Sequence, residues 1–411
     1  LAATGLGSRS RGRVDVQMAA EPGPPDTAGR QSFAVTSAGP GAAVIIQATA
    51  PGHKAIAAVI LTDQNPLVAV DIPLSGRAQV LNCSASAVTL DGVAQQEPED
   101  LGSLHLTVLP KVGEMRSLPL PARLRGLTGE HTSRNPGDGG ELRDVFAFQP
   151  GDQLRRIDWR TSARRSTDQD RIFVRRTFAH SEAAVHLLID HAFDYPAQTE
   201  LWFASGQPSL GEVASLHLTR EAATLLASSY LAHGDRVGLN EISGLRHPLR
   251  ASAGRRQLEL IRTRLAILRP AARPERLSRD IPVPTGALLY VLSPFTDDEP
   301  GRLMRSWHAA GHRVIGVDTL PVLRGGSSSK AQGLAIQLCL LQRRHSLQEL
   351  DRLGIPVLGW RAETPDATAA DSFPGQLPLD VGLATLRGRY ARANGSAAAG
   401  MRNGSAAAGM R

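Results

Sequence analysis

The sequence predicts an α+β multidomain protein: an N-terminal antiparallel β-sandwich followed by a C-terminal doubly wound α/β domain. Short apolar runs separated by Gly, Pro, Asn and Asp fill residues 31–125, a texture typical of antiparallel strands. Over residues 184–362, strand-length apolar runs alternate with helical patterns, which predicts a parallel sheet covered on both faces. The 411 residues suffice for two or three domains at roughly 100–200 residues each.

The N-terminal region begins without a structural signal. Residues 1–30 are rich in Gly, Ser, Pro and Arg and lack periodic apolar positions, so we expect a disordered linker there. Turn signals such as Pro51-Gly52 and Asp91-Gly92 then punctuate the sandwich and predict tight turns between strands. The expected strands are 43–48, 55–61, 67–72, 78–81, 87–90 and 104–109.

The predicted α/β domain opens with the buried run 185–190, which ends on a carboxylate. The further expected strands are 236–242, 287–292, 314–317 and 357–360, and the expected helices are 212–233, 257–268, 299–310 and 334–353. Residues 363–411 are predicted to be a low-complexity tail. A nine-residue unit at 394–402 recurs unchanged at 403–411, which is too short for a solenoid repeat.

Composition excludes several classes of protein. Cys83 and Cys339 are the two cysteines, which rules out a disulfide framework and Cys-rich metal sites. Only three of the 46 cationic residues are Lys, and we interpret the arginine excess, net charge of +7 and pI of about 10.0 as a coding bias rather than a nucleic-acid surface. No zinc-protease, nucleophile-elbow or dinucleotide-binding motif occurs.

No apolar run reaches the ~18 residues that a membrane span needs. The chain begins at Leu1 rather than Met, and we keep open an N-terminal anchor that precedes this sequence.

The densest charge pattern lies in residues 126–183. Pro150-Gly151-Asp152 is a turn signal, and the aspartates that follow lie among arginines, whose planar forks suit bidentate pairing with carboxylates. Ile157 and Trp159 flank Asp158 and suit an apolar groove. The signature and interaction residues that we predict are Gly151, Asp152, Arg155, Arg156, Asp158, Trp159, Arg160 and Arg164.

Two interpretations of this segment are open. The first is an ion-paired clasp that joins the sandwich to the α/β domain. The second is a surface that binds a partner protein. A catalytic site is the weaker alternative, because His131 and Ser133 supply two members of a triad at most.

The core Pro-Gly-Asp-x-x-Arg-x-Ile-Asp-Trp-x-x-x-Ala-Arg, at residues 150–164, resembles the signature of the bacterial DUF58 family. That family usually has Glu-Phe and then Arg-x-Tyr just before the Pro-Gly-Asp, whereas here these places hold Leu142, Phe146 and Phe148. The resemblance implies that the doubly wound domain after the signature is von Willebrand factor A-like (vWA-like), a Rossmann-like fold. It also implies a partner among the MoxR-class AAA+ ATPases. It also implies chaperone-like or assembly work, often at the cytoplasmic face of the membrane, and most relatives carry two N-terminal transmembrane helices.

The resemblance also directs attention to a metal site. In vWA-like domains the first strand ends in Asp-x-Ser-x-Ser, and its oxygens help to hold a divalent ion. Here that run is Asp190-His191-Ala192-Phe193-Asp194, so both Ser positions are replaced and we expect a degenerate site. We predict no cofactor; the alternative is Mg²⁺ held by Asp190, Asp194 and Asp298.

We therefore expect a non-enzymatic interaction or scaffold protein of the cytoplasm, placed at the inner face of the cell membrane through its partner or a missing anchor. Two alternatives remain. One is a metal-dependent hydrolase that uses carboxylates at the strand ends. The other is a basic nucleic-acid-binding protein.

Overall fold

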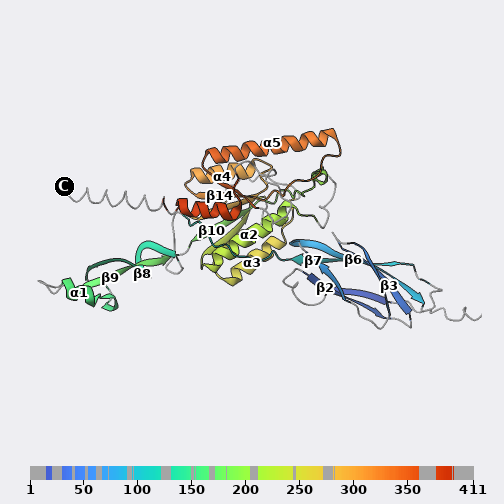
Figure 1. Ribbon diagram of the computed structural model, residues 1–411, viewed down its shortest axis with the longest axis horizontal. Coiled ribbons are helices and arrows are strands. Elements are labelled where there is room, and N and C mark those ends of the chain that lie inside the picture. Colours follow the sequence, from blue (N-terminus) through green and yellow to red (C-terminus); the bar gives the residue numbers. More distant parts are fainter. Residues whose placement is uncertain are drawn as a thin grey trace, which may run out of the picture.

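Figure 1 shows a computed structural model of the chain. It describes residues 15–20, 30–38, 42–50, 54–61, 67–72, 74–89, 95, 97–121, 131–149, 152, 154–165, 172–181, 183–203, 212–243, 247–271, 281, 283–360, 376–390 and 392. Within these residues, no helix is both long enough and apolar enough to cross a membrane.

Two antiparallel sheets form the N-terminal part, with strand orders β1-β2-β5 and β4-β3-β6-β7. Their strands are β1 (Asp15–Ala20), β2 (Arg30–Ala38), β3 (Ala42–Thr49), β4 (Ile56–Leu61), β5 (Leu67–Asp71), β6 (Gly76–Thr89) and β7 (Glu99–Val108). Val70 of β5 packs in one core with Ala48 of β3 and Val80 of β6. The two sheets therefore share buried apolar side chains, as strands with alternating faces allow.

Two expectations for this part need correction. Residues 15–20 were expected to be disordered, but they form β1, which pairs with β2. Val16, Met18 and Ala20 alternate with other residues in the period-two pattern of a strand, and the surrounding Gly, Pro and Arg conceal it. The run 78–81 and residues 87–89 of the run 87–90, expected to be separate strands, belong to the single strand β6.

The C-terminal part contains a six-stranded sheet of order β12-β11-β10-β13-β14-β15. Its strands are β10 (Ala184–Ile189), β11 (Arg236–Glu241), β12 (Leu249–Ser252), β13 (Leu288–Ser293), β14 (Arg313–Asp318) and β15 (Val357–Gly359). All pairs are parallel except β11–β12. The chain starts at the central strand β10 and adds β11 and β12 on one side. It then returns to add β13, β14 and β15 on the other side. The strand order therefore reverses between β10 and β13, which we call the switch point.

Helices cover both faces of this sheet (Figure 1). They are α2 (Ser215–Ala232), α3 (Arg255–Ala266), α4 (Glu299–Ala309) and α5 (Lys330–Arg352), with a short 3-10 helix η3 (Thr199–Phe203). Leu187 of β10 packs with α2 and α3, whereas its neighbour Leu188 packs with α4 and α5. Successive residues of a strand point to opposite faces, so a continuous apolar run such as β10 is needed to fill both cores.

A further helix over residues 379–390 corrects the predicted low-complexity tail. Leu379, Leu383 and Leu386 are buried in the same core as α2 and α3. Their spacing of four and three residues places them on one helical face. The α/β domain thus extends beyond residue 362. The nine-residue repeats at 394–411 lie outside the described residues.

The segment 110–121, which we call the strap, connects the N-terminal sheets to the rest of the chain. The expected sandwich boundary at residue 125 is therefore too late, because the strap packs on the α/β domain. Met115 and Leu118 are buried against α2, and the backbone N–H of Met115 donates to Ser229 Oγ at 2.8 Å. The hydroxyl of Tyr230 donates to the carbonyl of Pro119 at 2.7 Å.

Arg220 of α2 joins the N-terminal sheets to the α/β domain. Its buried guanidinium donates to three carbonyls: Ser75 at 2.8 Å, Leu265 at 3.1 Å and Leu268 at 2.8 Å. Gly76 has a positive φ of 116°, and a Cβ there would lie 2.6 Å from Arg220 Nη1. Glycine is therefore required both by the backbone conformation and by the close approach of the arginine.

The predicted signature segment forms a projecting element that we call the arm. It consists of β8 (His131–Ala147), η2 (Leu154–Arg156), α1 (Trp159–Arg165) and β9 (Phe173–Ser181), and β8 pairs antiparallel with β9. Figure 1 shows the arm extending from the α/β domain on the side opposite to the N-terminal sheets, with α1 near its far end.

Candidate functional site

The arm begins its signature with a hydrogen-bonded turn. The backbone N–H of Gln149 donates to Asp152 Oδ2 at 2.9 Å, and the N–H of Asp152 donates to the Gln149 carbonyl at 3.0 Å. Asp152 thus has the turn role that its position after Pro150 predicts. Gly151 lies outside the described residues.

Asp158 organises the next part of the arm. Its Oδ1 accepts from the backbone N–H of Thr161 at 3.0 Å, which caps the first turn of α1, and its Oδ2 accepts from Arg175 Nε at 3.1 Å. The pKa of Asp158 is lowered, mainly by the Thr161 N–H and further by Arg175. The ionised carboxylate therefore both starts α1 and ties it to β9.

Two further contacts of the segment lie within the arm. Ser162 Oγ accepts from the backbone N–H of Phe173 at 2.8 Å, and Ile157 forms a β-bridge to the buried Val174. Among the described residues, the partners of Asp158 belong to α1 and β9. For Asp158 this differs from the expected clasp between the two domains. Arg220 and the strap connect the N-terminal sheets to the α/β domain.

Large apolar side chains of the arm face solvent instead of an apolar groove. Trp159 is 68% exposed, Leu154 71% and Phe146 50%. Of the predicted arginines, Arg155, Arg160 and Arg164 are exposed and Arg156 is half-buried. Residues 150–165 hold five arginines and two aspartates, so the exposed tryptophan lies in a segment with an excess of positive charge.

A second cluster lies at the carboxyl edge of the sheet. Asp190, just after β10, accepts at Oδ1 from the Ser243 hydroxyl at 2.9 Å and from the Ala192 N–H at 3.1 Å. Its Oδ2 accepts from the Ser293 hydroxyl at 2.6 Å. Because Ser243 follows β11 and Ser293 ends β13, this carboxylate links three strand ends at the switch point, where open α/β sheets usually bind ligands.

The three predicted metal ligands have different surroundings. Asp194 Oδ1 accepts from the Leu216 N–H at 2.8 Å at the start of α2, and burial raises the pKa of Asp194. Asp298 is exposed beside Arg305, at 3.5 Å. In the part of the chain that the structure describes, no group of three or more His, Cys, Asp or Glu side chains is arranged to hold a metal ion. The magnesium site remains a prediction.

Residues 144–320 match the model of DUF58, a protein of unknown function. The matched stretch starts within β8, includes α1 and β9, and ends just after β14. It therefore contains both the arm's signature and the cluster around Asp190. A search of curated proteins found no match.

Two further polar groups lie within the DUF58 stretch: Asp297, which the sequence offered beside Asp298 as a third-loop carboxylate, and Glu241, which was not anticipated. Asp297 lies near Asp190, and burial together with the negative charge of Asp190 raises the pKa of Asp297 to about 6. At the end of β11, Glu241 contacts Arg264 at 2.7 Å and His191 at 3.3 Å. The signal available in the sequence is positional: each of these residues follows or ends an apolar strand run.

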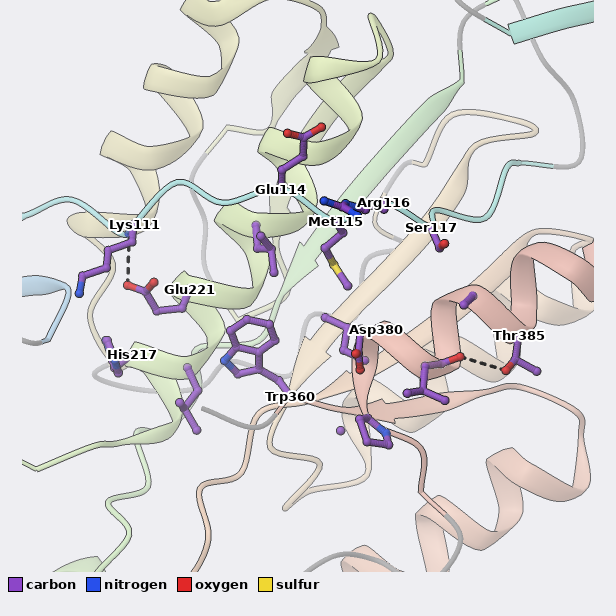
Figure 2. A pocket seen from close by; sticks show the side chains of 17 residues that line it. Lys111, Glu114, Met115, Arg116, Ser117, His217, Glu221, Trp360, Asp380 and Thr385 are labelled. Carbon is purple, nitrogen blue, oxygen red and sulfur yellow. Dashed lines mark hydrogen bonds between the residues drawn. The ribbon is translucent and has the colours of Figure 1, made fainter. Parts of the chain in front are cut away.

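A groove of about 1270 Å³ lies between the strap, α2, the end of β15 and helix 379–390 (Figure 2). Of these elements, α2 alone belongs to the DUF58 stretch. Trp360 occupies its centre, and its buried Nε1 has no hydrogen-bond partner among the described residues. Glu221 accepts from the Lys111 backbone N–H at 3.4 Å on one side. His217 Nδ1 accepts from the backbone N–H of Ser75 at 3.0 Å. The side chains of Glu221 and His217 therefore both have structural partners.

Proposed function

We propose that the protein is a non-enzymatic interaction protein in which a vWA-like α/β domain carries a projecting arm that docks a partner protein. The strand order supports the vWA-like assignment. Counted from β10, it reads third, second, first, fourth, fifth, sixth, a common doubly wound order, and the edge strand β12 is antiparallel.

The observation that carries this proposal is the exposure of Trp159 on the arm. A tryptophan 68% exposed gains free energy when a partner covers it. Tryptophan and arginine are also the residue types that most often dominate protein interfaces. The exposed arginines Arg155 and Arg160 lie within four residues of Trp159 in the sequence, so the arm combines an apolar anchor with cations that suit an acidic partner surface.

The proposed partner is a MoxR-class AAA+ ATPase, which the DUF58 resemblance implies. Such an ATPase would use the arm as its docking point, and the α/β domain would hold the arm away from the N-terminal sheets. The proposed setting is chaperone-like or assembly work in the cytoplasm, at the inner face of the membrane.

Binding of purified full-length protein to a MoxR-class ATPase of the same organism, measured with ATP present, tests this function. We expect Trp159→Ala to weaken binding by at least about tenfold, as removal of an interface anchor does. Phe203→Ala is the matched control, because Phe203 is an exposed aromatic residue of the α/β domain. Binding that is absent in the wild type, or equal in both variants, contradicts the proposal.

A further inference from the structure

The N-terminal half of α5 exposes three leucines. Leu334 is 60% exposed, Leu338 66% and Leu341 58%. The C-terminal half of the same helix is anchored, with Leu347 and Leu350 buried in the core shared with α4. Figure 1 shows α5 as the outermost element on its side of the sheet, running past the end of α4.

These leucines form one continuous face. Together with the exposed Ala331, they recur at intervals of three, four and three residues, which places them on a single line along the helix. This is the spacing of the seam in paired helices. Single exposed leucines are common on protein surfaces, but a contiguous apolar line marks an interaction site. We call residues 331, 334, 338 and 341 the leucine stripe.

The residues flanking the stripe specify the charge of what covers it. In paired helices, the positions beside the seam set the choice of partner. Here those positions hold Lys330, Ala335, Gln337, Gln342 and Arg344. Lys330 and Arg344 are exposed cations at the two ends of the stripe, and the neutral residues lie between them. A covering helix with acidic flanks would therefore meet complementary charge.

A second copy of the chain fits this surface poorly. In an antiparallel pair, Lys330 of one copy would approach Arg344 of the other, and like charges repel. In a parallel pair, Arg344 would approach Glu349 of the other copy. Glu349 is already engaged by Arg305 at 3.1 Å and by His345 at 3.3 Å. Self-association therefore brings cations together or competes with existing ion pairs.

We infer that the leucine stripe of α5 docks an amphipathic helix of another protein, with apolar residues at the same spacing and Glu or Asp at the flanking positions. Apolar anchors at this spacing are the usual means by which a helix binds an apolar surface. The inference is independent of the arm, because α5 follows the DUF58 stretch and lies on a different part of the molecule.

Two designed helical peptides of about three heptads test the inference against the full-length chain by fluorescence anisotropy. Both have leucines at the seam positions; one has Glu at the flanking positions and the other has Lys. We expect the Glu peptide to bind at least about tenfold more tightly than the Lys peptide. The substitution Leu338→Asp in the full-length chain should weaken binding of the Glu peptide by at least about tenfold.

Leu260→Asp is the matched control, because Leu260 is 47% exposed on α3 and outside the stripe; it should leave binding unchanged. An unchanged circular dichroism spectrum confirms that each variant folds. Equal binding of the two peptides, or no binding of either, overturns the inference. A concentration-dependent dimer abolished by Leu338→Asp would assign the stripe to a second copy. The thiols of two variants, Leu338→Cys and Leu353→Cys, can also be alkylated in the free monomer. If the thiol at position 338 reacts much more slowly than the thiol at position 353, a segment of the same chain covers the stripe and the inference is wrong.

Discussion

His217 gives the contact between the N-terminal sheets and α2 a defined pH dependence. Burial, with Arg220 and Lys111 adding repulsion, lowers the pKa of His217 from 6.5 to about 4. Below pH 6.5 the unfolded chain takes up a proton that the folded chain does not bind. The free energy of unfolding should therefore decrease as the pH falls from about 6.5 to about 4, by roughly 2 to 3 kcal/mol.

Urea unfolding at pH 7 and pH 4.5 measures this contribution. His217→Gln keeps an acceptor for the Ser75 N–H but cannot be protonated, so the variant should lose less stability between these pH values than the wild type. An identical loss in both proteins would mean that His217 is ordinarily solvated.

Asp297 should titrate in the opposite sense. Its pKa is raised from 3.8 to about 6, first by burial and then by the charge of Asp190. Between about pH 4 and pH 6 the folded state holds a proton that the unfolded state has released, so this group's stabilisation is lost as the pH rises through 6. We expect an NMR titration of the Asp297 carboxyl carbon to show a midpoint near pH 6.

Asp190→Asn provides the control for this assignment. It should lower the Asp297 midpoint but leave it above 3.8, because burial is the larger cause. A midpoint near pH 4 for Asp297 in the wild type would show that neither burial nor the charge of Asp190 raises its pKa.

Among the elements, helix 379–390 is the one whose role is most easily tested. Leu383 is fully buried in the core with α2 and α3, whereas Val381 is 48% exposed on the same helix. Leu383→Ala should reduce the free energy of unfolding by about 2–5 kcal/mol, through lost burial and a cavity. Val381→Ala should change it by less than about 0.5 kcal/mol. Denaturant unfolding measures both variants. Equal free energies of unfolding for the two variants would mean that helix 379–390 does not pack in the core of the α/β domain.

Helices and strands with a clear pattern of apolar residues could be predicted from the sequence, and those with few apolar residues or an obscured pattern could not. The apolar run Val185–Ile189 indicated β10 because a strand buried on both faces needs apolar residues throughout. By contrast, β12 has four residues and one antiparallel neighbour, too few to separate a strand from a loop. Helix 379–390 does carry a leucine pattern, but the Gly- and Ala-rich sequence after it obscured that signal.

For the whole molecule, the position of the signature decides how its residues act. Aspartate, arginine and tryptophan in one segment suit a buried joint and an exposed docking surface equally well, so composition could not choose between them. The structure uses Arg220 for the joint and places Trp159 on the arm, 68% exposed. Arg220 was not predictable, because its three carbonyl acceptors come from segments distant in sequence.

Hydrogen exchange of the full-length protein, alone and in complex with a MoxR-class ATPase, tests the docking arm most directly. The account predicts slower exchange of the amides of η2 and α1, residues 154–165, in the complex. It also predicts no change in α2, which is buried beneath the strap. Slower exchange confined to the sheet edge around Asp190, with the arm unchanged, would contradict it.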